Sequence, residues 1–332
     1  KPVKAMGMFP RPLILVSLLL CITLSGAAEE QSPPFAGSKA ITITATAVDI
    51  GAIAHANVIR PVQGWVLGSD DPDFGGLSAL AAGKGGFLAI SDTGLLVKVA
   101  PDLTRARLQS MPRACVPRQL KRERDSESLA RDPATGTVWI GFEYRNAICR
   151  IGAKGGARGV APLPMIRWPK LGGPEAMLRR ADGRFFVFAE RSPKGGAIAP
   201  LLSFDRDPVD PRAIVTAMRY EAPPQYHPVD AAMLPDGRML VVNRRYAFPL
   251  NFSTIVTLVE PFEIRPGALV RGRPVIVLAP PHVADNFEGI AVETRGAHTR
   301  VWLVSDDNFL PQQRTYLLEF ELVKARSGGD GS

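Results

Sequence analysis

Short apolar segments separated by glycine-containing turns recur five times along this chain. Each copy has a polar or acidic residue, a strand of small and apolar residues, a turn, a run of about four apolar residues and a second polar residue. The fifth copy, residues 286–292 and 301–308, shows this order clearly, and the others begin near Gly76, Glu127, Glu175 and Asp230. A period of roughly 50 residues is typical of propellers and solenoids.

The apolar runs predict strands that are covered on both faces. Residues 185–188 and 301–304 are apolar throughout instead of alternating with polar residues. A doubly wound α/β fold would also cover both faces, but it needs an amphipathic helix after each strand, and the intervals here are short and rich in Gly and Pro. Further strands follow instead, at residues 95–99, 147–151, 201–204, 254–259 and 316–322.

A fourth strand is expected in some copies, at residues 214–220 and 274–278. Four antiparallel strands per repeat make a propeller blade. The sequence therefore predicts an all-β fold, a propeller of five blades. The fifth copy reaches only three strands, so we expect an amino-terminal strand from residues 41–48 or 62–67 to close the ring. Six blades are the alternative, although residues 41–74 hold at most two strands.

The first residues resemble a secretory signal. Arg11 precedes an apolar run, residues 13–24, and small residues follow it. The run of about 12 residues is shorter than the roughly 20 that a membrane-spanning helix needs. We expect a signal peptide at residues 1–27, cleaved without leaving a membrane anchor, a flexible linker at 28–40, the propeller at 41–323 and a disordered tail at 324–332. The mature protein is then expected to be periplasmic or secreted.

The charge of the chain gives little indication of nucleic-acid binding. The formal net charge is +8, and removing residues 1–27, which hold Lys1, Lys4 and Arg11 but no acid, lowers it to +5. The basic residues are scattered and are not interleaved with aromatic ones.

We expect the protein to be a monomer, and we expect its binding partner to be a small-molecule ester or phosphate.

Two cysteines, Cys115 and Cys149, flank the second copy. Export to an oxidising compartment would favour a disulfide between them, and a loop of about 35 residues closed in this way stabilises a fold by about 3 to 4 kcal/mol. Two separate buried thiols are the alternative.

The repeated polar positions are the candidate site. The first strand of each propeller blade lines the central channel, so the acids at these starts should form a ring: Glu127, Glu175, Asp230 and Glu288. A second set follows the apolar runs: Asp92, Glu143, Glu190, Asn243 and Asp306. Arginines stand directly behind two of them, as Arg191 and as Arg244 with Arg245.

Carboxylates that converge on one axis repel one another unless a cation lies between them. Calcium is a candidate because it prefers carboxylate, amide and carbonyl oxygens. The candidate metal ligands are Glu127, Glu175, Asp230, Glu288, Asp306, Asp307 and Asn308. Inter-blade salt bridges to the arginines and a directly catalytic carboxylate ring are the other interpretations.

Several other chemistries lack their motifs. The sequence has no Gly-x-Ser-x-Gly elbow, no phosphate-binding glycine loop before a helix and no histidine cluster for zinc. His227, shortly before Asp230, is the one histidine that we expect near the channel mouth.

The closing stretch carries a family resemblance. Residues 285–292, 305–309 and 313–320, with 74–78 and 234–245, resemble the bacterial phytase-like family, often described as having esterase-like activity. The resemblance covers about residues 60–322. It implies an exported β-propeller related to calcium-dependent phytases, whose channel acids hold calcium and whose basic residues meet phosphate. The matching positions are Asp92, Glu127, Glu190, Arg191, Arg244, Arg245, Glu288, Asp306, Asp307 and Asn308.

Two functional hypotheses follow. In the first, the protein is a calcium-assisted hydrolase of a phosphate or carboxylic ester at the channel mouth. Arg191 and Arg244 would hold the anionic group, and Glu143 or Glu190 would act as general base. In the second, it is a non-catalytic periplasmic propeller that binds a ligand or protein and uses the ring for structure only.

Overall fold

The computed structural model describes residues 37–323, except residues 52, 118–119, 165–167, 170–171 and 194–195. The expected signal peptide and carboxy-terminal tail lie outside the described residues. Of the segment 28–40, expected as a linker, Ser38–Ala40 belong to strand β1 (Ser38–Thr42). No helix in the described part of the chain is long and apolar enough to span a membrane.

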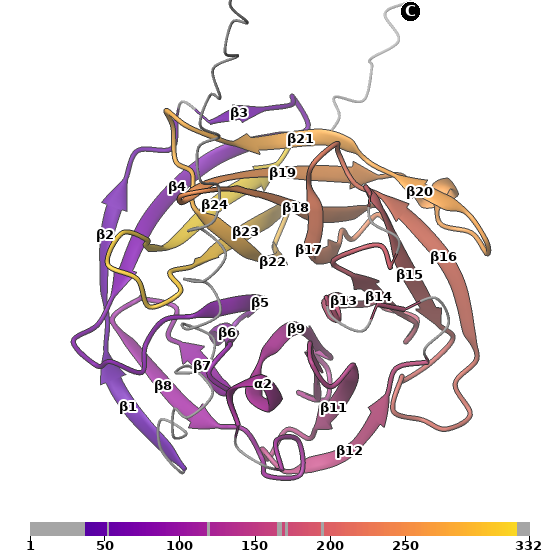
Figure 1. Cartoon of the computed structure of the whole chain (residues 1–332). Coiled ribbons are helices and arrows are strands. Elements are labelled where there is room, and N and C mark those ends of the chain that lie inside the picture. Colours follow the sequence, from indigo (N-terminus) through magenta and orange to yellow (C-terminus); the bar gives the residue numbers. More distant parts are fainter. Residues whose placement is uncertain are drawn as a thin grey trace, which may run out of the picture.

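Five small sheets stand around a central axis and form a propeller (Figure 1). The predicted five-bladed fold is confirmed, and residues 41–74 do not form a sixth blade. Blade 1 contains β5 (Leu77–Gly83), β6 (Gly86–Ser91), β7 (Leu95–Val99) and β8 (Arg105–Ser110). Blade 2 contains β9 (Ser126–Arg131), β10 (Val138–Phe142), β11 (Ala147–Ile151) and β12 (Ala157–Pro162). A short helix, α2 (Lys121–Arg124), precedes blade 2.

The other three blades follow the same order from the axis outward. Blade 3 contains β13 (Pro174–Arg179), β14 (Phe185–Ala189), β15 (Ile198–Phe204), β16 (Val215–Glu221) and the added parallel strand β20 (Leu269–Arg271). Blade 4 contains β17 (His227–Met233), β18 (Met239–Ala247), β19 (Asn251–Val259) and β21 (Arg273–Leu278), with η2 (Pro261–Glu263) after β19. Blade 5 contains β22 (Asn286–Arg295), β23 (His298–Asp306) and β24 (Thr315–Leu322).

The amino-terminal segment closes the ring, as the sequence predicts. Strand β4 (Ile59–Gly68) pairs with β24, and β2 (Thr44–Val48) pairs with β4, so both expected segments contribute to blade 5. The same segment reaches two more blades, because β1 pairs with β8 of blade 1 and β3 (Ala54–His55) pairs with β21 of blade 4. This part of the chain therefore joins three blades (Figure 1).

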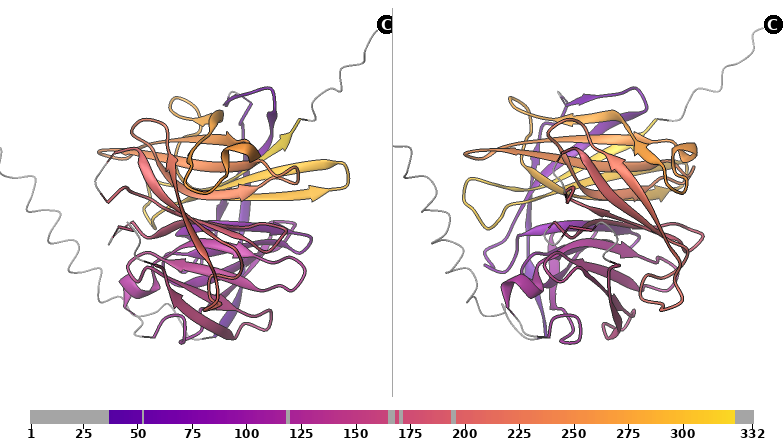
Figure 2. Two further views of the ribbon diagram at one scale, coloured as in Figure 1. Left: turned by 90° about the vertical axis from the view of Figure 1, so that its right-hand side faces the viewer. Right: turned by 45° about the vertical axis from the view of Figure 1, so that its right-hand side comes forward.

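The hydrophobic core is a set of layers between neighbouring blades. One layer joins Leu240 and Val242 of blade 4 to Phe287 and Leu303 of blade 5, and four similar layers complete the circle. The blades are strongly twisted sheets stacked side by side, as Figure 2 shows. This packing explains the apolar runs, since the middle strands of each blade are covered on both faces.

Cys115 and Cys149 form a disulfide, with 5.5 Å between their Cα atoms. Both are fully buried against blades 1 and 2. Of the two alternatives from the sequence, the bonded pair is the one present.

Candidate functional site

The pairing of the first two strands in each blade brings the predicted polar positions to one end of the channel. The strands are antiparallel, so the start of the inner strand lies beside the end of its neighbour. Asn286 is paired with Asp306 in blade 5, and His227 is paired with Arg244 in blade 4. In blade 2 the amide of Glu143 donates to the carbonyl of Asp125 over 3.1 Å.

Each inner strand has a β-bulge near its start, and the side chain of the bulged residue departs from the regular alternation of the strand. In every blade the ladder skips one residue of the inner strand: Ser78, Glu127, Glu175, Val229 and Glu288. Bulges turn a side chain out of the regular alternation and are common beside functional sites. Three of the five skipped residues are glutamates, and these are three of the four expected ring acids.

The fourth ring acid, Asp230, is displaced by one position from the bulge. Val229 is the skipped residue in blade 4, and a shift of one residue in a strand points the side chain to the opposite face. Asp230 is 1% exposed and accepts hydrogen bonds from the amides of Ala231 and Ile290, each 2.8 Å long. It therefore links blade 4 to blade 5 and does not join the other acids. Burial raises its pKa well above the ordinary value.

Three carboxylates of blade 2 form a cluster. One oxygen each of Asp125, Glu127 and Glu143 can be chosen so that all lie within 4.8 Å of one another. All three side chains are half-buried, since they border the channel. Glu143 accepts a hydrogen bond from the amide of Gly172 over 2.9 Å. Its second oxygen accepts none within the described part of the chain.

Uncompensated negative charge dominates the electrostatics of this cluster. Burial, with Asp92 and Glu143 nearby, raises the pKa of Asp125 to about 7. Burial and the neighbouring carboxylates of Asp125 and Glu175 raise the pKa of Glu127 well above its usual range. The pKa of Glu175 is also raised, by burial and then by Glu190 and Glu143. Such crowding is relieved by protonation or by a bound cation.

Arg244 is the centre of a second group. Its guanidinium donates to Glu288, to the side-chain oxygen of Asn286 over 2.8 Å and to Glu190 over 3.2 Å. Glu190 comes from blade 3, Arg244 from blade 4 and Glu288 from blade 5, so the arginine connects three blades. Arg191 donates through Nε to the other oxygen of Glu190 over 2.7 Å, and its side chain is 65% exposed.

A third group of acids lies between blades 5 and 1. Burial and the nearby Asp92 raise the pKa of Asp306 to about 8. Asp307 uses its oxygens to bind the amide of Gly76 over 2.9 Å and the hydroxyl of Thr315 over 2.9 Å. Gly76 has φ +63, and a Cβ there would lie 2.4 Å from the carboxylate of Asp92. Gly76, where the first copy of the repeat begins, thus allows Asp92 and Asp307 to approach the backbone here.

Asn308 lies beside this group and contributes through an amide. Its side chain donates to Gln313 over 3.1 Å, and its backbone amide donates to Asp306 over 2.6 Å. Lys121 on α2 is 3.6 Å from Asp92 and supplies a positive charge at the edge of the site.

Two residues of the site, Asp125 and Asn286, were not predicted from the sequence. Asp125 precedes the repeated pattern, but its spacing of two residues from Glu127 on one strand edge is a signal that could have identified it. Asn286 was noted only as part of a motif, whereas its amide binds Glu288 over 3.0 Å. Asn243, one of the second polar positions, is fully buried and is bound to Tyr220 within blades 3 and 4.

A cavity of about 460 Å³ opens beside the Arg244 group. Polar and apolar side chains share its lining: Glu190, Arg191, Gln225, His227, Arg244, Tyr246, Leu250, Phe252, Asn286, Asn308, Leu310 and Gln313. Burial lowers the pKa of His227. The size is suited to a small molecule.

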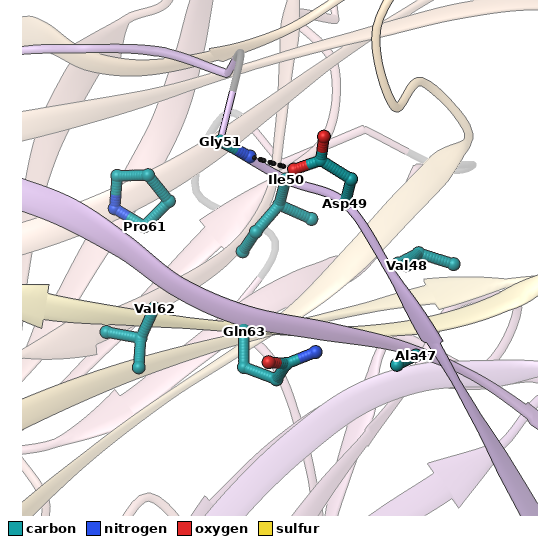
Figure 3. A pocket seen from close by; sticks show the side chains of 8 residues that line it. All are labelled: Ala47, Val48, Asp49, Ile50, Gly51, Pro61, Val62 and Gln63. Atoms are coloured by element: carbon teal, nitrogen blue, oxygen red, sulfur yellow. Dashed lines mark hydrogen bonds between the residues drawn. The ribbon is translucent and has the colours of Figure 1, made fainter.

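A second hollow, of about 420 Å³, lies at the outer side of blade 5 between β2 and β4 (Figure 3). Asp49 is the one charged residue of its lining, and the carboxylate of Asp49 is bound to the amide of Gly51 over 2.8 Å. Its lining has a single carboxylate, whereas the cavity beside Arg244 is lined by Glu190, Arg191, His227 and Arg244.

The fold and the site define a five-bladed β-propeller with acidic and arginine clusters at one end of its channel. The family model for phytase-like proteins, described as esterase-like activity of phytase, matches residues 72–309. This match spans more than half of the chain, and the protein belongs to that family. The resemblance noted in the sequence is thereby confirmed.

Comparison with solved structures gives distant matches. Virginiamycin B lyase from Staphylococcus aureus is 9% identical, with a TM-score of 0.41, over 85% of this chain and 100% of that chain. A gluconolactonase from Xanthomonas campestris is 12% identical, with a TM-score of 0.42, over 88% of this chain and 98% of that chain. Likenesses at this level carry no argument about activity. A search of curated protein sequences found no significant match.

Proposed function

We propose that this protein is an exported hydrolase that cleaves a phosphate or carboxylic ester at the channel mouth with the help of calcium. One observation carries the proposal: the same end of the channel holds a cluster of carboxylates and, beside it, a cavity with two arginines. Ester hydrolysis needs an activated water and a positive group for the anion or oxyanion. The two clusters offer a place for each.

The donor set fits a hard divalent cation. Asp125 and Glu127 supply carboxylate oxygens that lie within 4.8 Å of each other and of a Glu143 oxygen, and calcium prefers oxygen ligands. Burial and the neighbouring carboxylates raise the pKa values of Asp125 and Glu127, and a cation bound among these oxygens would relieve that repulsion. A bound calcium ion would supply Lewis-acid activation of the ester and of water.

The two arginines have different tasks in this proposal. Arg244 is held by Glu190 and Glu288, so its orientation toward the cavity is fixed. Arg191 is more exposed, and its two terminal amino groups make no hydrogen bond to the residues that the structure describes. Arg191 therefore meets the anionic group of the substrate, and Arg244 fixes the wall beside it.

The structure favours Glu143 over Glu190 as the proton acceptor. Each oxygen of Glu190 is bound to an arginine, so this residue positions Arg191 and Arg244. Glu143 has a carboxylate oxygen without a hydrogen bond from the described residues, beside Asp125 and Glu127. We assign it the proton of the attacking water.

A non-catalytic binding propeller is the second candidate. The observation that favours it is the Arg244 group, which ties three blades together and would be useful for stability alone. This candidate predicts that calcium changes the melting temperature but that no ester is hydrolysed.

The proposal is tested by turnover of 4-nitrophenyl phosphate and 4-nitrophenyl acetate with calcium and with chelator. Wild type should hydrolyse at least one ester in a calcium-dependent manner. Glu143→Gln should lower kcat by about 100-fold, as expected for loss of a general base. Asp210→Asn, on the loop between β15 and β16, is the control and should behave as wild type. Hydrolysis that is unchanged by Glu143→Gln, or absent from wild type, would refute the proposal.

Export is part of the proposal and has one structural support. The disulfide between Cys115 and Cys149 is typical of proteins from oxidising compartments. We propose a monomer in the periplasm or outside the cell, whose partner is a small ester.

A further inference from the structure

The cavity beside Arg244 has two unlike sides. Its floor is polar, with Glu190, Arg191 and Arg244. Its other side is apolar and comes from the long hairpin of β18 and β19 and from the loop after β23. Tyr246 and Phe252 form part of this side, with ring centroids 5.0 Å apart.

The apolar side is unusually open to water. Tyr246 is 52% exposed, and Leu250 and Leu310 are 42% and 41% exposed. Exposed apolar side chains that gather at the wall of a polar cavity are typical of a binding site, since a ligand that covers them gains from removal of that surface from water. A ligand with an apolar part is therefore favoured here.

The charge of the floor limits the number of anionic groups that the cavity can accept. Arg244 is already shared by Glu190 and Glu288, and Arg191 is paired with Glu190 through Nε. Two arginines thus face two glutamates, which leaves little net positive charge. A polyphosphate would bring several charges close to these acids without enough arginines to balance them, and a single calcium ion at the neighbouring carboxylate cluster would offset only part of that charge.

We propose that the cavity selects a substrate with a single anionic group and an aromatic or other apolar group, bound by Arg191 and by the Tyr246–Phe252 pair. As a statement about substrates, this inference rests on the proposed hydrolase function. It separates the protein from an enzyme for highly phosphorylated inositols. The terminal amino groups of Arg191 take the anion, and the two rings cover the apolar part.

Binding, measured apart from turnover, tests the inference. Isothermal titration calorimetry of the full chain in calcium compares 2-naphthoate, acetate and inositol hexakisphosphate. We expect 2-naphthoate to bind at least about tenfold more tightly than acetate, because burial of an aromatic ring contributes at least this much. It should also bind more tightly than inositol hexakisphosphate. Tighter binding of the hexakisphosphate would overturn the inference.

Variants on one hairpin give a matched pair. Tyr246→Ala should weaken 2-naphthoate binding by about tenfold. Phe248→Ala should leave it unchanged, because Phe248 is 88% exposed at the tip of the same hairpin and does not line the cavity. Arg191→Gln should weaken 2-naphthoate but not the neutral 2-naphthol. Equal losses in Tyr246→Ala and Phe248→Ala would contradict the assignment.

The two proposals fail in different ways. If 2-naphthoate binds as expected and no ester is hydrolysed, the hydrolase proposal is wrong and the cavity is a binding site for apolar anions. If esters are hydrolysed but the naphthyl group brings no gain in affinity, the hydrolase proposal stands and the inference about its substrate is wrong.

Discussion

Removal of the Arg244 side chain should destabilise the protein strongly. Its side chain is 19% exposed, and its guanidinium binds Glu190 and Glu288, whose side chains are 9% and 11% exposed. In Arg244→Met both carboxylates lose their shared cation. Breaking a buried ion pair by removing one partner costs about 3 to 5 kcal/mol, because the other charge stays buried without compensation.

The stability effect of Arg244→Met can be compared with that of Arg191→Met, because Arg191 is an exposed arginine that binds the same glutamate. Arg191 binds Glu190 but is 65% exposed, and an exposed pair contributes about 1 kcal/mol or less. Arg191→Met should therefore leave stability almost unchanged. The two arginines bind the same glutamate but differ in burial and in the number of their partners, so the contrast measures the contribution of the buried network around Arg244.

Urea denaturation followed by tryptophan fluorescence measures both variants against wild type. We expect a clear fall in the midpoint for Arg244→Met and almost none for Arg191→Met. Adding Glu190→Gln and Glu288→Gln to Arg244→Met should restore part of the loss, since the uncompensated charges are then gone. Equal stabilities of Arg244→Met and Arg191→Met would refute the view that Arg244 joins the three blades.

Three further predictions concern residues away from the arginines. Cys115→Ala should lower the free energy of unfolding by about 3 to 4 kcal/mol, because the lost disulfide closes a loop with a sequence separation of 34, and reductant should do the same to wild type. Asp230→Ala should cost about 2 kcal/mol, since the amide of Ile290 loses its buried acceptor, and Asp230→Asn should cost less in thermal melts. The pKa of Glu321 is held below its usual 4.5 by its hydrogen bond to His298, so this carboxylate stabilises the fold above about pH 4.5 and its contribution is lost as the pH falls through the lowered value. Glu321→Gln should therefore lose about 1 kcal/mol at pH 7, and in acid unfolding its difference from wild type should shrink below about pH 4.5 and vanish only below the lowered pKa of Glu321.

The sequence predicted the number of blades because the inner strands carry a strong repeated pattern. Strands β7 and β11 were predicted with their bounds, since four of the five residues in each are apolar and pack between two blades. Strands β8 and β12 were not predicted. They are outer strands: exposed and buried residues alternate at the start of β8, exposed and half-buried residues alternate along β12, and both segments contain few large apolar residues.

The site was predictable only up to the details of strand register. Glu127, Glu175 and Glu288 could be placed at the channel because they begin repeated strands. Asp230 also begins a repeated strand in the sequence pattern. In blade 4, however, the bulged residue is Val229, so the side chain of Asp230 does not point where the side chains of the other three acids point. A bulge moves a side chain by one position, and no pattern of apolar residues records that shift.

The contact of the amino-terminal segment with three blades was also beyond the sequence. Residues 41–48 and 62–67 could be assigned to ring closure because blade 5 lacks outer strands. The pairing of β1 with β8 and of β3 with β21 joins segments far apart in the chain. Such pairings depend on geometry that local propensity does not specify.

Calcium binding to purified protein tests the central claim most directly, namely that Asp125 and Glu127 hold a cation beside Glu143 and that Asp230 takes no part in this site. In a calorimetric titration, calcium should bind to the wild-type protein. Glu127→Gln should lower the affinity by at least about tenfold, because one carboxylate ligand loses its charge. Asp230→Asn should leave the affinity unchanged. Absence of calcium binding in wild type, or an equal loss in Asp230→Asn, would contradict the account.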